Sequence, residues 1–248
     1  MPPRATIWPI DEHTRGKHLV LQRYLNAWLP ILAQSRGRIV FIDAFAGPGR
    51  YSNGEPGSPI IALRALKQHL ALPRLKGEII LLFVEDSEAR YRHLESEVAV
   101  EREGLPSSVI TTVEHGKFHQ VVGSILDYME KKQANLAPSF MMVDPFGVSE
   151  CPMSVIQRFL RHASSEVLAT FMVEFIDRFD ATGEFPPHLD ELFGTDAWRR
   201  VDTTAPKAAR IAAYCDLYET QLRAAGAGSV LRFDLYSGSR LEAISQMP

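Results

Sequence analysis

The feature that most constrains the fold is a short apolar run that ends at a glycine-rich turn. Residues Arg38–Asp43 form a β-branched and aromatic run that is typical of a buried strand. The run is followed by Ala44-Phe45-Ala46-Gly47-Pro48-Gly49, and a helix start is indicated at Ser58-Pro59. A strand, a glycine turn and a helix in this order are typical of α/β proteins that bind a nucleotide-like ligand at the turn.

Strand and helix patterns continue to alternate along the chain, which predicts βαβ units. Further strands are expected at residues 78–84, 109–113, 139–143, 167–175 and 230–235. Helices are expected at residues 14–35, 58–70, 88–103, 119–133, 152–162 and 205–225. The predicted fold class is therefore α/β, with a doubly wound and mostly parallel sheet.

We expect residues 1–248 to form a single domain. Within it, residues 1–37 should be an N-terminal helical extension, and residues 176–202 should be an irregular, lid-like insertion. Pro30 should kink or split the first helix. The residues after 235 are poor in β-branched side chains and leave little room for a hairpin, so the last strand is expected to be missing or irregular and the chain to be a truncated domain.

The composition excludes several classes of protein. The 248 residues are 46% hydrophobic and 23% charged, which is ordinary for a globular protein. No apolar run approaches the roughly 20 residues that span a bilayer, and no secretory signal is visible. Cys151 and Cys215 are too few for a disulfide framework, so we expect a cytoplasmic protein without membrane association.

The charge is unevenly distributed. The net charge is −3, but residues 1–70 carry nine Lys/Arg against four Asp/Glu, whereas residues 71–248 carry 18 against 26. The segment with net charge +5 contains the glycine turn, so nucleic acid stays a candidate partner despite the acidic total.

The sequence of the turn discriminates among cofactors. A dinucleotide fingerprint needs a third small residue after Gly47 and Gly49 and an acid about 20 positions later, where Lys67 stands instead. A phosphate-binding loop of the Walker A type is absent. S-adenosyl-L-methionine fits better, since Asp43 could bind its ammonium group, Glu85 its ribose hydroxyls and Phe118 its adenine.

Several segments together resemble the three-Cys-motif partner proteins (TcmP), over most of residues 8–175. The segments that carry the resemblance are Glu12-His13-Thr14, Lys17-His18, Ala27–Leu32, Phe41–Tyr51, Gly57-Ser58-Pro59 and Asp144-Pro145-Phe146-Gly147. The resemblance implies a methyltransferase-like Rossmann domain and a protein partner that bears the three-Cys motif. The chain is more distantly similar to the bacterial ribosomal-RNA adenine-N6 methyltransferases, which share a Lys-His pair on the first helix and a glycine turn followed by Arg-Tyr.

Strand ends and the resemblance together define the candidate residues. The expected cofactor-binding residues are Lys17, Asp43, Phe45, Gly47, Gly49, Glu85, Asp86, Lys117 and Phe118. The expected substrate-side residues are His18, Arg50 and Tyr51. No metal is expected, because Gly116 and the nearby strand end keep His115 and His119 from sharing one regular helix.

The turn after the fourth strand, Asp144-Pro145-Phe146-Gly147, suggests the chemistry. In amino methyltransferases an Asp/Asn-Pro-Pro-aromatic turn accepts the N–H bonds of an exocyclic amine and stacks the flipped base. Asp144 and the carbonyl of Pro145 or Phe146 could be the acceptors. Here the stacking position is Gly147, so the target would be smaller or the stack would come from Tyr51, Phe179 or Phe185.

The favoured hypothesis is therefore an enzyme, an S-adenosylmethionine-dependent methyltransferase acting on an exocyclic amine of a nucleic-acid base, with Asp144, Pro145 and Phe146 at the reacting centre. Two alternatives stay open. The chain could be a non-catalytic module that binds S-adenosylmethionine and works with a second protein. It could also methylate a protein or a small molecule.

Overall fold

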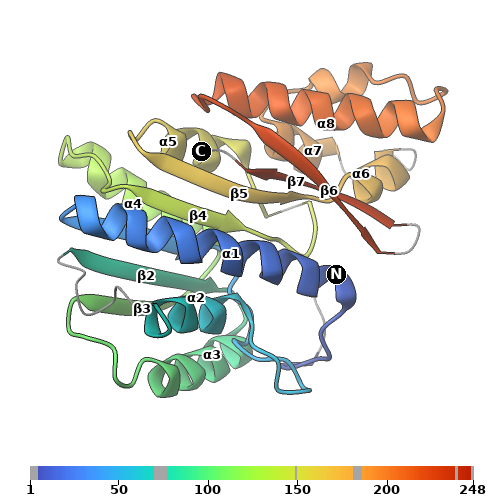
Figure 1. Cartoon of the computed structure of the whole chain (residues 1–248). Helices are drawn as coiled ribbons and strands as arrows, with labels where there is room; N and C mark the ends of the chain where they lie inside the picture. Colours follow the sequence, from blue (N-terminus) through green and yellow to red (C-terminus); the bar gives the residue numbers. More distant parts are fainter. Residues whose placement is uncertain (1–4, 70–76, 149, 181–185, 238–239, 247–248) are drawn as a thin grey trace. The chain divides into compact units, whose positions relative to one another are not determined.

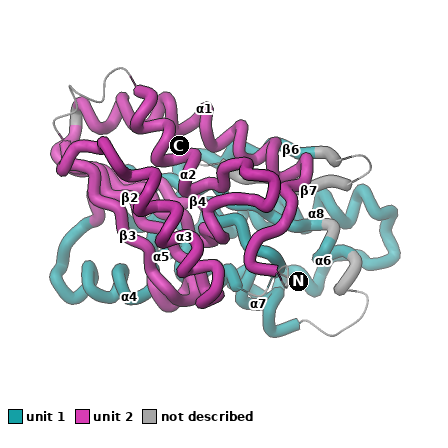
Figure 2. The backbone as a smooth tube through the Cα atoms, turned by 90° about the horizontal axis from the view of Figure 1, so that it is seen from below, with its two compact units in different colours: residues 1–2, 122–135, 143–248 teal, residues 3–121, 136–142 magenta. Residues whose placement is uncertain are grey.

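The computed structural model describes residues 5–69, 77–148, 150–180, 186–237 and 240–246. The chain divides into two compact units (Figure 2). Unit 1 comprises Met1–Pro2, Val122–Asn135 and Val143–Pro248, and unit 2 comprises Pro3–Val121 and Leu136–Met142. The expectation of a single domain stays a prediction.

Unit 2 contains parallel strands in the order β3-β2-β1-β4. Their bounds are β1 (Arg38–Asp43), β2 (Glu78–Glu85), β3 (Val109–His115) and β4 (Ser139–Val143). All four were expected, because buried parallel strands appear in a sequence as short continuous apolar runs. Asp43, the last residue of β1, lies opposite Phe83 and Met142, so the carboxyl ends of three strands meet at one edge.

Helix α1 precedes β1 and runs along the sheet (Figure 1), and the helices that follow connect successive strands. Their bounds are α1 (Glu12–Ser35), α2 (Ser58–Lys67) and α3 (Glu88–Glu101), and α4 (Phe118–Lys131) begins here and continues into unit 1. Leu21, Leu25 and Leu29 recur every four residues and are buried, which explains why α1 packs along one face.

The structure refines the local expectations about these helices. The first helix continues through Pro30 as one element and is not split. Its N-cap is Asp11, whose carboxylate accepts a hydrogen bond of 2.7 Å from the Thr14 N–H, so the helix begins two residues before the expected start at residue 14. Helix α2 begins at Ser58, as the Ser58-Pro59 pair indicated, and its N-cap is Gly57.

Unit 1 contains an antiparallel group of strands in the order β5-β7-β6. The bounds are β5 (Ser165–Phe171), β6 (Leu231–Ser237) and β7 (Arg240–Gln246). The prediction that the last strand is missing or irregular was therefore wrong. A hairpin loop of two residues is enough to connect two antiparallel strands. In addition, β7 pairs with a strand on each side, and these main-chain hydrogen bonds outweigh its weak β-propensity.

The helices of unit 1 also correct the sequence analysis. They are α5 (Met153–Leu160), α6 (Val173–Asp180), α7 (Pro186–Phe193), the 3₁₀ helix η2 (Ala197–Arg200) and α8 (Lys207–Ala224). The described part of the expected irregular insertion 176–202 is thus largely helical. Pro186 and Pro187 occupy the first turn of α7, where the backbone N–H that proline lacks has no partner within the helix. Likewise β5 ends at Phe171, and the expected strand tail belongs to α6.

Aromatic side chains build the core of unit 1. Phe171 on β5 and Tyr218 on α8 stack with ring centroids 4.3 Å apart, and Phe193 of α7 meets both rings edge-on. In the residues that the structure describes, no helix is long and apolar enough to cross a membrane.

Candidate functional site

The end of β1 presents a buried carboxylate beside a turn of left-handed glycines. Asp43 is fully buried, and its Oδ1 accepts a hydrogen bond of 3.3 Å from the Phe45 N–H. Gly47 and Gly49 have φ angles of +63° and +82°, a conformation that side chains with a Cβ rarely adopt. The expected Asp43–Gly49 segment is therefore a tight turn that depends on its glycines, and all of its residues except Phe45 are buried.

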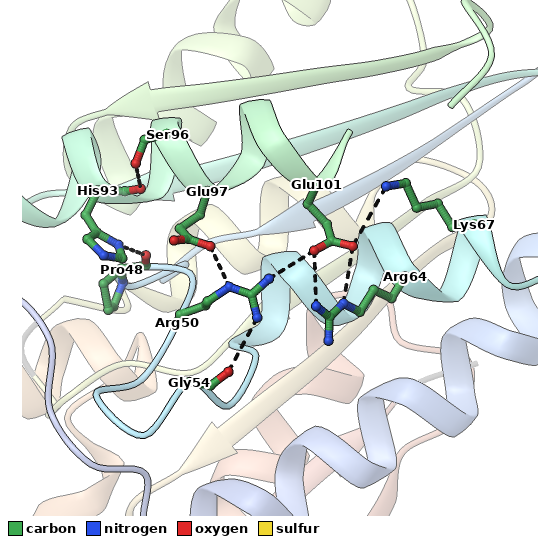
Figure 3. Close-up of polar contacts among 9 residues, drawn as sticks. All are labelled: Pro48, Arg50, Gly54, Arg64, Lys67, His93, Ser96, Glu97 and Glu101. Carbon is green, nitrogen blue, oxygen red and sulfur yellow. Dashed lines mark hydrogen bonds and ion pairs between the residues drawn. The ribbon is translucent and has the colours of Figure 1, made fainter. Parts of the chain in front are cut away.

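Helix α3 holds this turn from one side (Figure 3). His93 donates a hydrogen bond of 2.7 Å from Nδ1 to the Pro48 carbonyl oxygen. Gly49 lies so close to α3 that a Cβ there would approach Leu94 Cδ1 to 3.0 Å. The turn is closed from the other side by the Gly57 N–H, which donates to the Gly49 carbonyl oxygen across 2.7 Å. The turn is thus shaped by its neighbours as well as by its glycines.

Arg50 points to α3 (Figure 3). Its Nε lies 2.5 Å from Glu97 Oε2, and its Nη2 lies 3.0 Å from Glu101 Oε2. Glu101 also pairs with Arg64 and Lys67 of α2, at 3.2 and 3.9 Å. These contacts make Arg50 an anchor for the chain that leaves the glycine turn, and its expected substrate-side role stays a prediction.

The end of β2 carries a second buried carboxylate. Glu85 is 4% exposed, and its Oε1 accepts hydrogen bonds from the Ser87 N–H at 2.9 Å and from Arg90 Nε at 2.7 Å. Burial raises the pKa of the Glu85 carboxyl, and the two hydrogen bonds oppose that rise. Asp86, the next residue, is exposed and accepts from Arg90 Nη2 at 3.2 Å.

The end of β3 adds an aromatic wall. The Gly116 N–H donates to the Glu85 carbonyl oxygen across 3.0 Å, which ties the β3 turn to the end of β2. Phe118 is 2% exposed and its ring centroid lies 5.6 Å from that of Phe45. Lys117, the residue before Phe118, is exposed. The structure therefore groups Asp43, Glu85, Phe45 and Phe118 at the strand ends of unit 2.

The first helix contributes two further expected residues. Lys17 and His18 are buried, with 7% and 8% exposure. The His18 ring centroid lies 5.8 Å from that of Tyr51, and the Trp8 ring meets Tyr51 edge-on at 5.9 Å. The Ser52 N–H donates to the Trp8 carbonyl oxygen across 2.9 Å. The segment before α1 thus lies along the loop that follows the glycine turn.

The residues expected at the reacting centre follow β4 directly and belong to unit 1. Asp144 and Phe146 are partly exposed, and Pro145 is buried. The side chains of Phe179 and Phe185, considered for stacking, lie outside the described residues. Among the described side chains, no group of three His, Cys, Asp or Glu residues could hold a metal ion.

Four residues around the site were not singled out from the sequence: Trp8, Arg90, His93 and Glu97. Three of them lie on α3 with spacings of three and four residues, which places them on one helical face. That spacing, in the helix directly after a strand that ends at Glu85, is the signal that could have identified them. No comparable spacing in the sequence identifies Trp8.

Comparison with known proteins supports the fold. No family model matches the chain, and no curated protein matches it. The chain is similar to the structure of Trm1 from Pyrococcus horikoshii with S-adenosyl-L-methionine, with a TM-score of 0.53 and 13% identity, over 100% of this chain and 58% of that one. It thus spans a little over half of that protein's length.

Two further similarities are weaker. The O-methyltransferase from Bacillus cereus in complex with SAH gives a TM-score of 0.47 and 15% identity, over 96% of this chain and 90% of that one. The METTL16 MTase domain gives a TM-score of 0.46 and 14% identity, over 94% of this chain and 67% of that one. With the strand order of unit 2 and the likeness to Trm1, the chain has the Rossmann-like α/β fold found in S-adenosylmethionine-dependent methyltransferases.

Proposed function

We propose that the chain is an S-adenosyl-L-methionine-dependent methyltransferase. The observation that carries the proposal is the set of groups gathered at one strand edge of unit 2, two buried carboxylates, a left-handed glycine turn and an aromatic pair. The likeness in fold to a Trm1 structure that was determined with this cofactor supports it.

The donor set fits the chemistry of the cofactor. Asp43 is a carboxylate in an apolar setting, suited to the cofactor's ammonium group. Glu85 can accept hydrogen bonds from a ribose diol, and the Phe45–Phe118 pair offers an apolar wall to adenine. When bound, the cofactor supplies an electrophilic methyl group on a sulfonium sulfur. The part of the chain's own residues is to hold and orient it.

Our proposed substrate is an exocyclic amine of a nucleic-acid base. Such an amine is a poor nucleophile, because its lone pair is delocalised into the ring. Asp144 and the carbonyl of Pro145 or Phe146 would accept its two N–H bonds and orient the lone pair, so the rate gain would come from positioning and electrostatics. His18 and Tyr51 would line the substrate side.

The charge distribution modifies this proposal. Arg50, Arg64 and Lys67 belong to the basic segment 1–70, and each is paired with Glu97 or Glu101 of α3. Part of the +5 charge is therefore neutralised within unit 2, and contacts to phosphates would depend on fewer of the nine basic residues.

A second candidate is a non-catalytic module that binds the cofactor and works with a protein that bears a three-Cys motif. Gly147 at the stacking position favours it, because a glycine offers no ring to a flipped base. Methylation of a protein or a small molecule is a third candidate, and it keeps the same cofactor site.

Calorimetry with S-adenosylmethionine and S-adenosylhomocysteine tests the shared premise, with NAD as the matched negative ligand. We expect both sulfur ligands to bind and NAD not to bind. Lack of binding by both sulfur ligands would remove the enzyme and the module together. Transfer of a labelled methyl group to RNA or DNA, lost in Asp144→Ala with cofactor affinity retained, would separate the enzyme from the module.

A further inference from the structure

Arg90 occupies a position that helix stability does not explain. It is the third residue of α3, where the positive end of the helix dipole disfavours a cation. Its guanidinium is nevertheless buried, with 8% of the side chain exposed. Something other than the helix must therefore hold it in place.

The contacts of Arg90 identify what holds it. Its planar fork bridges two consecutive acids, with Nε on Glu85 Oε1 at 2.7 Å and Nη2 on Asp86 Oδ1 at 3.2 Å. The Trp8 ring lies against the guanidinium, with the Cζ atom 6.0 Å from the ring centroid, at the limit of a cation–π contact. Arg90 is thus fixed between the β2 end and the segment before α1.

Both hydrogen bonds that Glu85 receives from Ser87 and Arg90 fall on the same oxygen, Oε1. This arrangement fixes the rotation of the carboxylate and directs its other oxygen, Oε2, away from those donors. It also keeps a positive charge beside a carboxylate that is 4% exposed, where an unpaired negative charge would be strongly disfavoured.

We propose that Arg90 is a positioning residue for cofactor binding: it holds Glu85 Oε1 so that Oε2 faces the ribose diol in the ionised, accepting state. The inference rests on the proposed function, since it assigns the ribose to Glu85. Arg90 itself does not touch the cofactor in this scheme and acts only through Glu85.

The test is calorimetry with S-adenosylhomocysteine on Arg90→Met, with Arg92→Met as the matched control. Arg92 lies on the same helix and makes an exposed i, i+4 pair with Glu88 at 2.5 Å. At pH 7 we expect Arg90→Met to weaken binding by about tenfold or more, because a buried group loses its partner, and Arg92→Met to leave it unchanged.

The pH profile distinguishes positioning from simple damage. Arg90 supplies a hydrogen bond and a positive charge that oppose the rise of the Glu85 pKa caused by burial, so removing it should raise that pKa further. The affinity of Arg90→Met should therefore increase more steeply than that of the wild type as the pH rises from 6 to 9. An Arg90→Met protein with wild-type affinity and the wild-type pH profile would overturn the inference and leave the proposed function standing. A wild type that binds neither sulfur ligand would overturn both.

A double-mutant cycle keeps the inference testable if Arg90→Met fails to fold. Glu85→Gln removes the buried charge, so Arg90→Met can be added to it without leaving an unpaired carboxylate. If Arg90 acts through Glu85, the added substitution changes the affinity of Glu85→Gln by less than about twofold. A further tenfold loss would show that Arg90 acts independently, and the inference would be wrong.

Discussion

The imidazole of His93 and the main chain of Pro48 are joined by a hydrogen bond of 2.7 Å, although 45 residues separate them in the sequence. Because a carbonyl oxygen can only accept, Nδ1 of His93 carries the proton. Through this contact, α3, the helix that follows β2, fixes the position of the glycine turn that follows β1. Two consecutive βα units therefore share one ligand edge, and changes on α3 should be felt at the turn.

The close approach of Gly49 to α3 can be separated from its unusual backbone angle. Gly49 and Gly54 share a φ of +82°, but a Cβ on Gly54 meets nothing within 4 Å, whereas one on Gly49 meets Leu94 and Glu97. Gly54→Ala should lower the free energy of unfolding by about 1 kcal/mol, the cost of a left-handed alanine. Gly49→Ala should lower the free energy of unfolding by roughly 1–3 kcal/mol more than Gly54→Ala does, because the added Cβ overpacks against α3. It should also weaken cofactor binding. Urea titrations that show the same decrease in the free energy of unfolding for both variants would contradict the close approach of Gly49 to α3.

The ion pairs of Arg50 should matter more than those at the surface. Its side chain is 24% exposed and faces Glu97 and Glu101, which are 26% and 12% exposed. Arg50→Met should lower the free energy of unfolding by about 1–2 kcal/mol, because two partly buried carboxylates lose a partner. Arg15→Met removes the exposed pair with Glu55 and should leave the melting temperature almost unchanged. A reversed order would show that Arg50 does not anchor the loop.

The buried charge of Asp43 should lower the stability of the fold and strengthen the binding of S-adenosylmethionine. Asp43→Asn keeps the shape of a fully buried side chain and removes its charge. We expect the affinity for S-adenosylmethionine to fall by about tenfold or more, since a charged hydrogen bond to the ammonium is lost, while the melting temperature stays equal or rises. Calorimetry and a thermal melt on the same sample check both. Unchanged affinity would remove Asp43 from the proposed cofactor site.

Glu166 on β5 should give unit 1 a pH-dependent stability. Burial raises the pKa of its carboxyl to about 7, from a usual value near 4.5. Because the pKa is higher in the folded state than in the unfolded state, the carboxyl contributes fully to the free energy of unfolding below pH 4.5. That contribution is lost as the pH rises through 7. Glu166→Gln should therefore stabilise the protein by about 1 kcal/mol at pH 8, allowing for solvent screening, and have little effect at pH 4.5.

The matched control for this pH dependence is Glu103→Gln, at an exposed position after α3. Its unfolding free energy should follow the wild-type curve at every pH. If Glu166→Gln also followed the wild-type curve between pH 4.5 and 8, the carboxyl would not be shifted in the way described.

The parallel core could be predicted from the sequence because its signals are local. The expected strand at residues 78–84 is β2 (Glu78–Glu85), and the run Arg38–Asp43 is β1 without change. The positions of Asp43 and Glu85 at strand ends also follow from local pattern and one topological rule, and their role in cofactor binding stays a prediction.

What could not be predicted depends on tertiary partners. The final strand has weak propensity and forms because it is paired on both sides. The ion pairs of Arg50 with Glu97 and Glu101 depend on the register of α3, which the sequence does not reveal. The role of Arg90 is likewise invisible until the β2 end and α3 are folded together.

The position of β7 has a consequence for the order of folding. Leu168 of β5 pairs with Gln246 of β7, and β7 lies between β5 and β6 although it follows both in the sequence. The β6–β7 hairpin is a local structure that can form quickly, whereas its docking on β5 closes a long loop and must be slow. Until that docking, β5 exposes an unpaired edge. Unit 1 is therefore the part of the molecule whose assembly should limit the folding rate and risk self-association on the way.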